Sequence, residues 1–256
     1  MPYATTDDGM KLYFEETGEG APIVFVHEFA ADHRSWEMQM RHFGQRYRCI
    51  TYGARGYPPS DVPEKPESYS QNRATDDILA VMDHLGIDKA VIGGLSLGGY
   101  MSLAFNLAHP SMVRALMLFD TGPGYKNPVG REGWNVTAMK RAETFEAKGL
   151  DALGGSAEVR VSQHRSAQGL AHAARGMLAQ FDSRIIESLE HIVVPTLVLV
   201  GEKDQPFLGA TDYMANKIPN ATKAVIADAG HASNIDQPAE FNRAVMAFLG
   251  GLTLSA

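Results

Sequence analysis

Ser96 lies in the stretch GLSLG (94–98), between an apolar run at 89–95 and a helical pattern that begins at Leu97. This Gly-x-Ser-x-Gly spacing is typical of a nucleophile elbow, a sharp strand-to-helix turn where small flanking residues leave room for an exposed serine. A serine hydroxyl is a weak nucleophile at neutral pH, so it needs a base for its proton and a third group to orient that base. The pattern therefore predicts acyl transfer by a serine, a histidine and an acid.

The histidine and the acid are expected in loops that follow predicted strands. His231 lies in the sequence DAGHASNIDQP, after the last apolar run and before the final helical pattern. Asp204 follows the apolar run at 196–200. Asp120 also ends an apolar run and is a second candidate for the acid. We favour Asp204, in the chain order Ser, Asp, His.

The surrounding pattern predicts an α/β fold. Six short apolar runs are interpreted as strands, at 23–27, 48–52, 89–95, 114–120, 196–200 and 223–228. They are continuous, as in a parallel sheet covered on both faces. Helices are predicted at 70–86, which ends on Gly86, and at 239–251. The order of these elements favours a mostly parallel, doubly wound sheet, and KLYFEE (11–16) is a candidate antiparallel edge strand.

The segment 122–191 contains no strand-like run. Its patterns predict helices at 134–150, 157–181 and 183–191. We therefore expect a core of residues 1–121 and 192–256, with a helical cap (122–191) inserted between two sheet strands. The cap could cover the site as a lid, or it could be a helical elaboration without a catalytic role.

Composition narrows the class of ligand. The chain has 256 residues, 45% hydrophobic and 21% charged, with a formal net charge of −7. An acidic chain offers no attraction to phosphate backbones or anionic lipid, so we expect a small-molecule substrate and neither nucleic acid nor membrane as partner. A homo-oligomer is left open.

Cysteine and terminal patterns complete these expectations. The single cysteine, Cys49, lies in an apolar run and is expected in the core. The first residues lack the basic start and apolar run of a secretion signal, and no apolar run is long enough for a membrane span, so a cytoplasmic protein is expected. No Cys/His cluster has metal-ligand spacing and no GxGxxG follows the first sheet strand, so neither a metal nor an organic cofactor is expected.

Over nearly its full length the chain resembles α/β-hydrolase-fold serine hydrolases. The matching stretches are VFVHEF, YGARGYPPSD, GGLSLGGYMSLAFNLAHP, VPTLVLVGEKDQPF and GHASNIDQPAEFN. Within that superfamily it most resembles small capped enzymes that include enol-lactonases, carboxylesterases and carbon–carbon bond hydrolases. The resemblance implies Ser96 as nucleophile, His231 as base and then acid, and Asp204 as the group that orients the imidazole. It also implies an oxyanion hole formed by the backbone N–H groups of Leu97 and Phe29.

Two positions depart from the family pattern. The usual His-Gly is His27-Glu28, and the usual Asp-x-Arg-Gly is Gly53-Ala54-Arg55-Gly56. A carboxylate aimed into an oxyanion hole would oppose the developing negative charge. We therefore expect the Glu28 side chain to point away from Ser96, held by a hydrogen bond or a basic partner. The alternative is that it faces the pocket and positions a cationic or hydroxylated substrate group.

Aromatic residues suggest a partly apolar substrate. Tyr125, Trp134 and Phe207 are the candidate binding residues, with Phe29 and Phe145 as further pocket walls, and core packing is the alternative for each. The expected activity is hydrolysis of a carboxylic ester or lactone through an acyl-enzyme.

Two other functions are kept open. Hydrolysis of a carbon–carbon bond in a dioxo acid would need a cation for the substrate carboxylate, and Arg55, Arg131 and Arg141 are candidates, with a solvated surface role as the alternative for each. A non-catalytic ligand-binding protein of the same fold is the other function, although an intact triad disfavours it.

Overall fold

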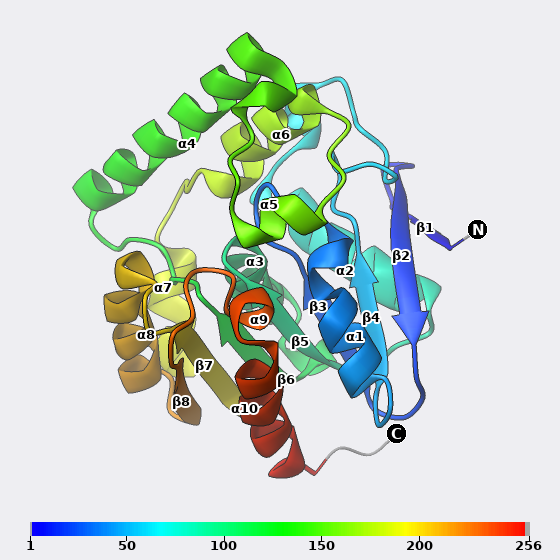
Figure 1. Cartoon of the computed structure of the whole chain (residues 1–256), viewed down its shortest axis with the longest axis vertical. Coiled ribbons are helices and arrows are strands. Elements are labelled where there is room, and N and C mark those ends of the chain that lie inside the picture. The colour runs from blue at the N-terminus through cyan, green and yellow to red at the C-terminus, as the bar shows by residue number, and fades with distance from the viewer. Residues whose placement is uncertain (1, 254–256) are drawn as a thin grey trace.

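The computed structural model describes residues 2–253 and contains one eight-stranded sheet (Figure 1). Its order is β1-β2-β4-β3-β5-β6-β7-β8. The strands are β1 (Tyr3–Thr5), β2 (Lys11–Thr17), β3 (Pro22–Val26), β4 (Arg48–Tyr52), β5 (Ala90–Leu95), β6 (Val113–Phe119), β7 (Thr196–Gly201) and β8 (Ala221–Ile226). Neighbours from β4 to β8 pair in parallel, whereas β2 pairs antiparallel with both β1 and β4. The mostly parallel sheet is confirmed, but β2 is not the edge strand because β1 lies outside it.

Helices cover both faces of the sheet. One face carries α1 (Glu37–Phe43) and α10 (Pro238–Gly250), and the other carries α2 (Gln71–His84), α3 (Leu97–Ala108) and α8 (Gln205–Lys217). Short helices η1 (His33–Trp36), η2 (Pro66–Ser68), η3 (Pro110–Met112) and α9 (Ser233–Asp236) lie in connecting loops.

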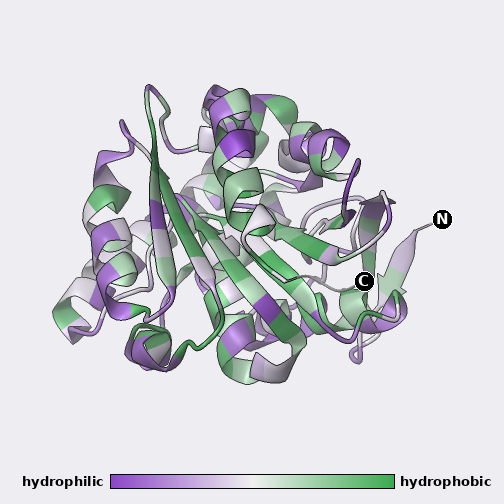
Figure 2. Ribbon diagram, turned by 90° about the horizontal axis from the view of Figure 1, so that it is seen from below, coloured by the Kyte–Doolittle hydropathy of each residue, from purple (hydrophilic) through white to green (hydrophobic). Residues whose placement is uncertain are grey.

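The strands explain this arrangement, because alternate residues point to opposite faces. In β3, Ile23 and Phe25 join the core beneath α1 and α10, while Val24 and Val26 join the core beneath α2 and α3. Figure 2 shows hydrophobic residues concentrated on the central strands and hydrophilic ones on the outer surfaces of the helices. The predicted doubly wound arrangement is confirmed.

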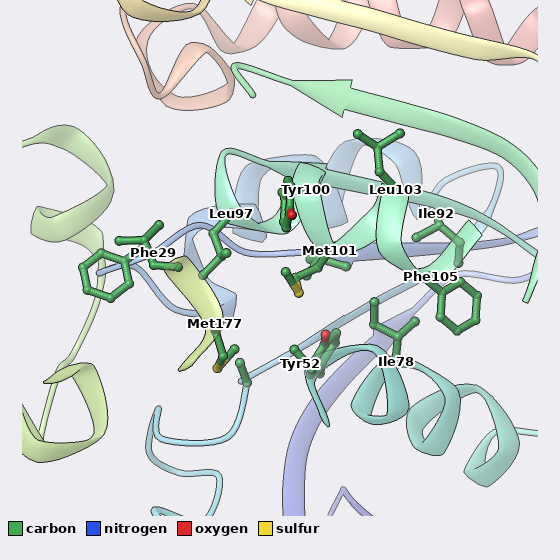
Figure 3. Packing of buried hydrophobic residues seen from close by; sticks show 14 of the residues in the cluster. Phe29, Tyr52, Ile78, Ile92, Leu97, Tyr100, Met101, Leu103, Phe105 and Met177 are labelled. Carbon is green, nitrogen blue, oxygen red and sulfur yellow. The ribbon is translucent and has the colours of Figure 1, made fainter. Parts of the chain in front are cut away.

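The chain between β6 and β7 is helical, as the sequence predicts. It contains α4 (Pro128–Lys148), η4 (Gly149–Ala152), α5 (Ala157–Val161), α6 (Ala167–Ala173), the π-helical turn η5 (Ala174–Leu178), α7 (Arg184–Ser188) and η6 (Leu189–His191). Helices α4, α5 and α6 lie beyond one end of the strands (Figure 1). Met177 of η5 belongs to the same hydrophobic cluster as Phe29, Leu97 and Phe105 (Figure 3). Helix α7 of the insertion contacts α3, the helix that follows Ser96, and η5 contacts α2.

Two predicted helix boundaries in this insertion are wrong. The region 157–181 is broken after α5, because the Gln163 N–H donates to Asp32 Oδ2 (2.8 Å) and His164 Nε2 lies 2.7 Å from the Ala30 carbonyl. These contacts pull the chain out of the helix, and the Ser166 hydroxyl then caps α6. Helix α4 begins at Pro128, earlier than the predicted 134, because Asn127 caps it and proline suits its first turn.

Two further expectations concern the single cysteine and membrane-spanning helices. Cys49 is buried, and burial raises the pKa of its thiol to about 12, so it is a packing residue as expected. None of the helices within residues 2–253 is both long enough and apolar enough to span a membrane.

Candidate active site

Ser96 occupies a strained turn between β5 and α3. Its φ of 54° and ψ of −116° place a non-glycine residue in the positive-φ region, which costs energy unless the surroundings enforce it. The Ser96 N–H donates to the Phe119 carbonyl (2.9 Å), and the Thr121 hydroxyl donates to the Ser96 carbonyl (2.6 Å). Hydrogen bonds at both its backbone N–H and its backbone carbonyl thus hold the serine in this conformation.

The neighbouring glycines allow close backbone approach at the elbow. A Cβ on Gly94 would lie 2.3 Å from the Gly98 backbone, and one on Gly98 would lie 2.1 Å from the Val26 carbonyl oxygen. Real Cβ atoms do not approach other atoms so closely. Glycine is therefore required for α3 to begin against the ends of β3 and β5.

His231 and Asp204 are brought together by the loops after β8 and β7. His231 Nδ1 lies 2.8 Å from Asp204 Oδ2, and the Asp204 side chain is 4% exposed against 35% for His231. Phe207 stacks on the imidazole, with ring centroids 5.0 Å apart and an interplanar angle of 24°. The imidazole is therefore oriented by a hydrogen bond to Asp204 and by stacking on Phe207.

The electrostatics of His231 favour its protonated form. Burial lowers the pKa of His231, but the hydrogen bond that its Nδ1–H donates to Asp204 and the charges of Asp204, Asp120 and Glu158 outweigh burial, so its net pKa is raised. An imidazolium formed during a reaction would therefore be stabilised.

Asp120, the second candidate for the acid, makes different contacts. Its Oδ1 accepts from the Gly201 N–H (2.7 Å), and its Oδ2 accepts from the Ser233 hydroxyl. Burial raises the pKa of Asp120 to about 7. The carboxylate that contacts His231 is therefore that of Asp204.

Ser96 opens into a cavity of about 310 Å³. The predicted binding residues Tyr125, Trp134 and Phe207 all line it, together with Leu97. Sequence reasoning missed its other walls, namely Tyr100, Thr121, Gly122, Pro123, Gly124, Leu178, Gln180, Ile186, Pro206, Ala210 and Tyr213. Only Tyr100 carried a signal, because it lies one helical turn after Ser96.

A second cavity, of about 620 Å³, adjoins Phe29, and we call it the Phe29 cavity. Phe29 and Phe145 line this cavity and not the one at Ser96, so their expected place as walls of the serine pocket is wrong. Lys140 and Arg141 of α4 also line it, and the Arg141 guanidinium carbon lies 5.7 Å from the Phe29 ring centroid. The Phe29 cavity is therefore lined in part by cations.

The backbone at Phe29 is oriented by a buried histidine. The Ala54 N–H donates to His27 Nε2 (3.0 Å), so the ring hydrogen is on Nδ1, which donates to the Glu28 carbonyl (2.8 Å). Burial lowers the pKa of His27 to about 4, so the ring is neutral at pH 7. A trans peptide directs its N–H opposite to its C=O, so the Phe29 N–H points away from His27.

The two amides expected to form an oxyanion hole are available as donors. Within residues 2–253, neither the Phe29 N–H nor the Leu97 N–H donates to a backbone carbonyl. Leu97 is also the first residue of the 12-residue helix α3, where the N–H groups carry partial positive charge.

Glu28 is buried and bonded to a hydroxyl. The residue is 1% exposed, Oε2 accepts from the Ser35 hydroxyl (3.1 Å), and Oε1 has no hydrogen-bond partner within the described residues. Burial raises the pKa of Glu28 to about 8. Because of this pKa, Glu28 is a neutral acid at neutral pH, and a hydroxyl holds it. It lines neither the Ser96 cavity nor the Phe29 cavity.

This environment predicts an altered pH dependence of stability for Glu28→Gln. The folded pKa exceeds the ordinary value of 4.5, so in the wild type the unfolded state releases this proton first as pH rises, and stability falls between about pH 4.5 and 8. The glutamine variant lacks this loss, which is about 1.4 kcal/mol for each unit of pKa elevation. Urea unfolding of both proteins at pH 5 and pH 8 measures the difference, with the exposed Glu19→Gln as control. Equal pH dependence in wild type and Glu28→Gln would contradict this assignment, as would a shifted limb in the pH profile of kcat/KM.

The candidate arginines for a substrate carboxylate are separated. Arg55, expected either as a clamp or at the surface, is fully buried and pairs with Asp77 (2.6 Å) and Asp8 (2.9 Å), so both expectations are wrong. Arg131 lies by the Tyr125 carbonyl (3.4 Å). Arg141 alone of the three lines one of the two cavities described above. Within residues 2–253 no three His, Cys, Asp or Glu side chains are grouped so as to hold a metal ion.

Known proteins share this architecture. The model of the alpha/beta hydrolase fold matches residues 21–147. The 3-oxoadipate enol-lactonase 1 of Acinetobacter baylyi is 32% identical, over 93% of this chain and 92% of that protein. A thermophilic esterase from Thermogutta terrifontis superposes with a TM-score of 0.85 at 29% identity, over 97% of each chain. The enol-lactonase from Burkholderia xenovorans superposes with a TM-score of 0.79 at 25% identity, over 97% of this chain and 100% of that one.

Proposed function

This chain belongs to the α/β-hydrolase family, and we propose that it is a serine hydrolase that cleaves a carboxylic ester or lactone of a small, partly apolar substrate through an acyl-enzyme. The observation that carries the proposal is that Phe207 contacts both the Ser96 cavity and the His231 imidazole. Ser96 opens on a cavity lined by Phe207, and Phe207 stacks on the imidazole that Asp204 holds.

The first half-reaction forms the acyl-enzyme. His231 Nε2 takes the proton of Ser96 Oγ as that oxygen attacks the carbonyl carbon, and the amides of Leu97 and Phe29 stabilise the oxyanion. When the tetrahedral intermediate collapses, the bond to the leaving oxygen breaks and His231 gives its proton to that oxygen.

The second half-reaction releases the acid. Water gives a proton to His231 and attacks the acyl carbon, and collapse of the second intermediate breaks the bond to Ser96 Oγ, which regains the proton. Asp204 keeps the Nδ1–H tautomer throughout, so Nε2 remains the atom that exchanges protons.

A panel of esters and lactones tests this proposal. Wild-type protein is expected to hydrolyse p-nitrophenyl esters or small lactones, with a preference for apolar acyl groups that fit the 310 Å³ cavity. Binding of these compounds without turnover would instead support a non-catalytic binding protein.

Trp134 is expected to control acyl chain length. Its indole N–H donates to the Leu178 carbonyl (2.8 Å), and its ring lines the cavity beside Tyr125. Trp134→Ala should enlarge the cavity and shift the preference toward longer acyl chains more than it lowers the melting temperature. Profiles of kcat/KM from acetate to octanoate esters measure the shift. Identical profiles would make Trp134 an ordinary packing residue.

A second candidate function is hydrolysis of a substrate that carries a carboxylate, including a carbon–carbon bond in a dioxo acid. The supporting observation is that Lys140 and Arg141 line the Phe29 cavity, and neither forms an ion pair with an acidic side chain within residues 2–253. Arg141→Gln should then raise KM about fivefold for an ester with a free carboxylate, since an exposed ion pair contributes up to about 1 kcal/mol. A neutral ester of the same length should be unaffected, and Arg131→Gln should change neither KM. An equal effect on the charged and neutral esters would exclude a carboxylate subsite.

A further inference from the structure

Asp120 is hydrogen-bonded to both of the loops that carry Asp204 and His231. One carboxyl oxygen accepts from Gly201 at the end of β7, and the other accepts from Ser233 at the start of α9. We propose that Asp120 is a positioning residue that fixes the separation between the loop of Asp204 and the loop of His231. This inference rests on the proposed function and extends it to a residue outside the triad.

The bonded atoms lie close in the chain to the two residues they position. The Gly201 carbonyl accepts from the Asp204 N–H (3.0 Å), so the carboxylate of Asp120 holds the first residue of the turn that ends at Asp204. Ser233 lies two residues after His231. A displacement at either bond would therefore move Asp204 relative to His231.

The loop of His231 is also fixed on its other side. The Gly230 N–H donates to Asp236 Oδ2 (2.8 Å), so one carboxylate binds the residue before His231 and another binds the residue two positions after it. Asp236 belongs to α9, as Ser233 does, whereas Asp120 directly follows strand β6 and is bonded to β7. Asp120 is therefore the contact that ties this loop to the strands that also support Asp204.

The conformation of Asp120 is costly. It is fully buried, and its φ of 47° lies in the left-handed region, which is strained for a non-glycine residue. Its N–H donates to the Leu199 carbonyl (2.9 Å), which together with the Gly201 bond fixes it against β7. Such strain persists where the surroundings enforce it, and it gathers at functional sites.

Asp120 affects His231 through charge as well as position. The groups whose charges raise the pKa of His231 are Asp204, Asp120 and Glu158, and Glu28 is a fourth carboxyl that interacts with the imidazole. Ser233→Ala removes one bond and leaves the carboxyl of Asp120 in place. Asp120→Asn removes the charge and the bond that Oδ2 accepts. The two variants therefore separate position from charge.

The kinetic test compares these variants. Ser233→Ala is expected to lower kcat about tenfold with KM little changed, since a misplacement of about 1 Å can cost 100-fold. Ser233→Thr, which keeps the hydroxyl, should restore kcat. Asp120→Asn should also move the acid limb of kcat/KM to lower pH, because the negative charge that Asp120 carries above its own pKa of about 7 no longer raises the pKa of His231. Ser60→Ala is the matched control, since it loses a buried hydroxyl bonded to the Gly53 carbonyl. Wild-type kcat in Ser233→Ala, or an equal loss in Ser60→Ala, would overturn the proposal.

A second readout does not depend on turnover. The His231 Nδ1–H shared with Asp204 is expected to give a far-downfield proton resonance in the wild type, and Ser233→Ala should broaden or shift it while Ser233→Thr preserves it. If the wild type hydrolyses no ester or lactone, the proposed function is wrong, and this resonance still decides the role of Asp120. An unchanged resonance in Ser233→Ala would refute the positioning role.

Discussion

Ser96→Ala is expected to lower kcat for ester hydrolysis by a factor on the order of 10⁴ or more, because no other group at the elbow can form the acyl-enzyme. The melting temperature should change little. Alanine keeps the Cβ, and the backbone bonds to Phe119 and from Thr121 do not involve the Ser96 hydroxyl. Steady-state turnover of p-nitrophenyl esters and a thermal melt measure both effects.

The contrary outcome for Ser96→Ala is clear. If the variant still hydrolyses p-nitrophenyl esters at a rate near that of the wild type, Ser96 is not the nucleophile. If it fails to fold, Ser96→Gly, which also lacks the hydroxyl, provides a second variant for the same comparison.

Asp204→Asn is expected to have the second-largest effect, a loss in kcat of about 10³- to 10⁴-fold. An asparagine amide can donate to His231 Nδ1, which places the ring hydrogen on Nε2 and leaves that atom unable to take the Ser96 proton. The loss of the carboxylate also removes the bond and the charge that raise the pKa of His231. The acid limb of kcat/KM should therefore move to lower pH than in the wild type.

Asp120→Asn is the matched comparison for Asp204→Asn. Both residues are buried aspartates at strand ends, but only Asp204 contacts the imidazole. A loss in kcat of about tenfold is expected for Asp120→Asn from displacement of the two loops, together with the shift of the acid limb that loss of its charge causes. A larger loss in Asp120→Asn than in Asp204→Asn would make Asp120 the triad acid.

The elbow and the sheet were predictable because their signals are local. Parallel strands buried on both faces need continuous apolar runs, and each of the six runs forms a strand with ends within two residues of the prediction. The glycines around Ser96 belong to a short motif whose spacing reflects backbone contacts. Ser96, Asp204 and His231 each follow an apolar run that predicts a strand, and their chain order matches that of the fold.

The remaining features depend on contacts between distant parts of the chain. The break after α5 results from bonds to Ala30 and Asp32, more than 100 residues earlier. The burial of Arg55 requires Asp8 and Asp77, which no motif connects to it. The walls of the Ser96 cavity depend on how the helical insertion packs. Aromatic candidates there were predictable by type, but a polar wall residue such as Gln180 was not.

The most direct test of the central claim is intact-mass measurement after treatment with a fluorophosphonate. Such reagents phosphonylate a serine only when a neighbouring base activates its hydroxyl. The wild type is expected to gain the mass of one adduct, located on Ser96 by peptide mapping, and Ser96→Ala is expected to gain none. An unlabelled wild type, or equal labelling of the Ser96→Ala variant, would contradict the assignment of Ser96 as an activated nucleophile.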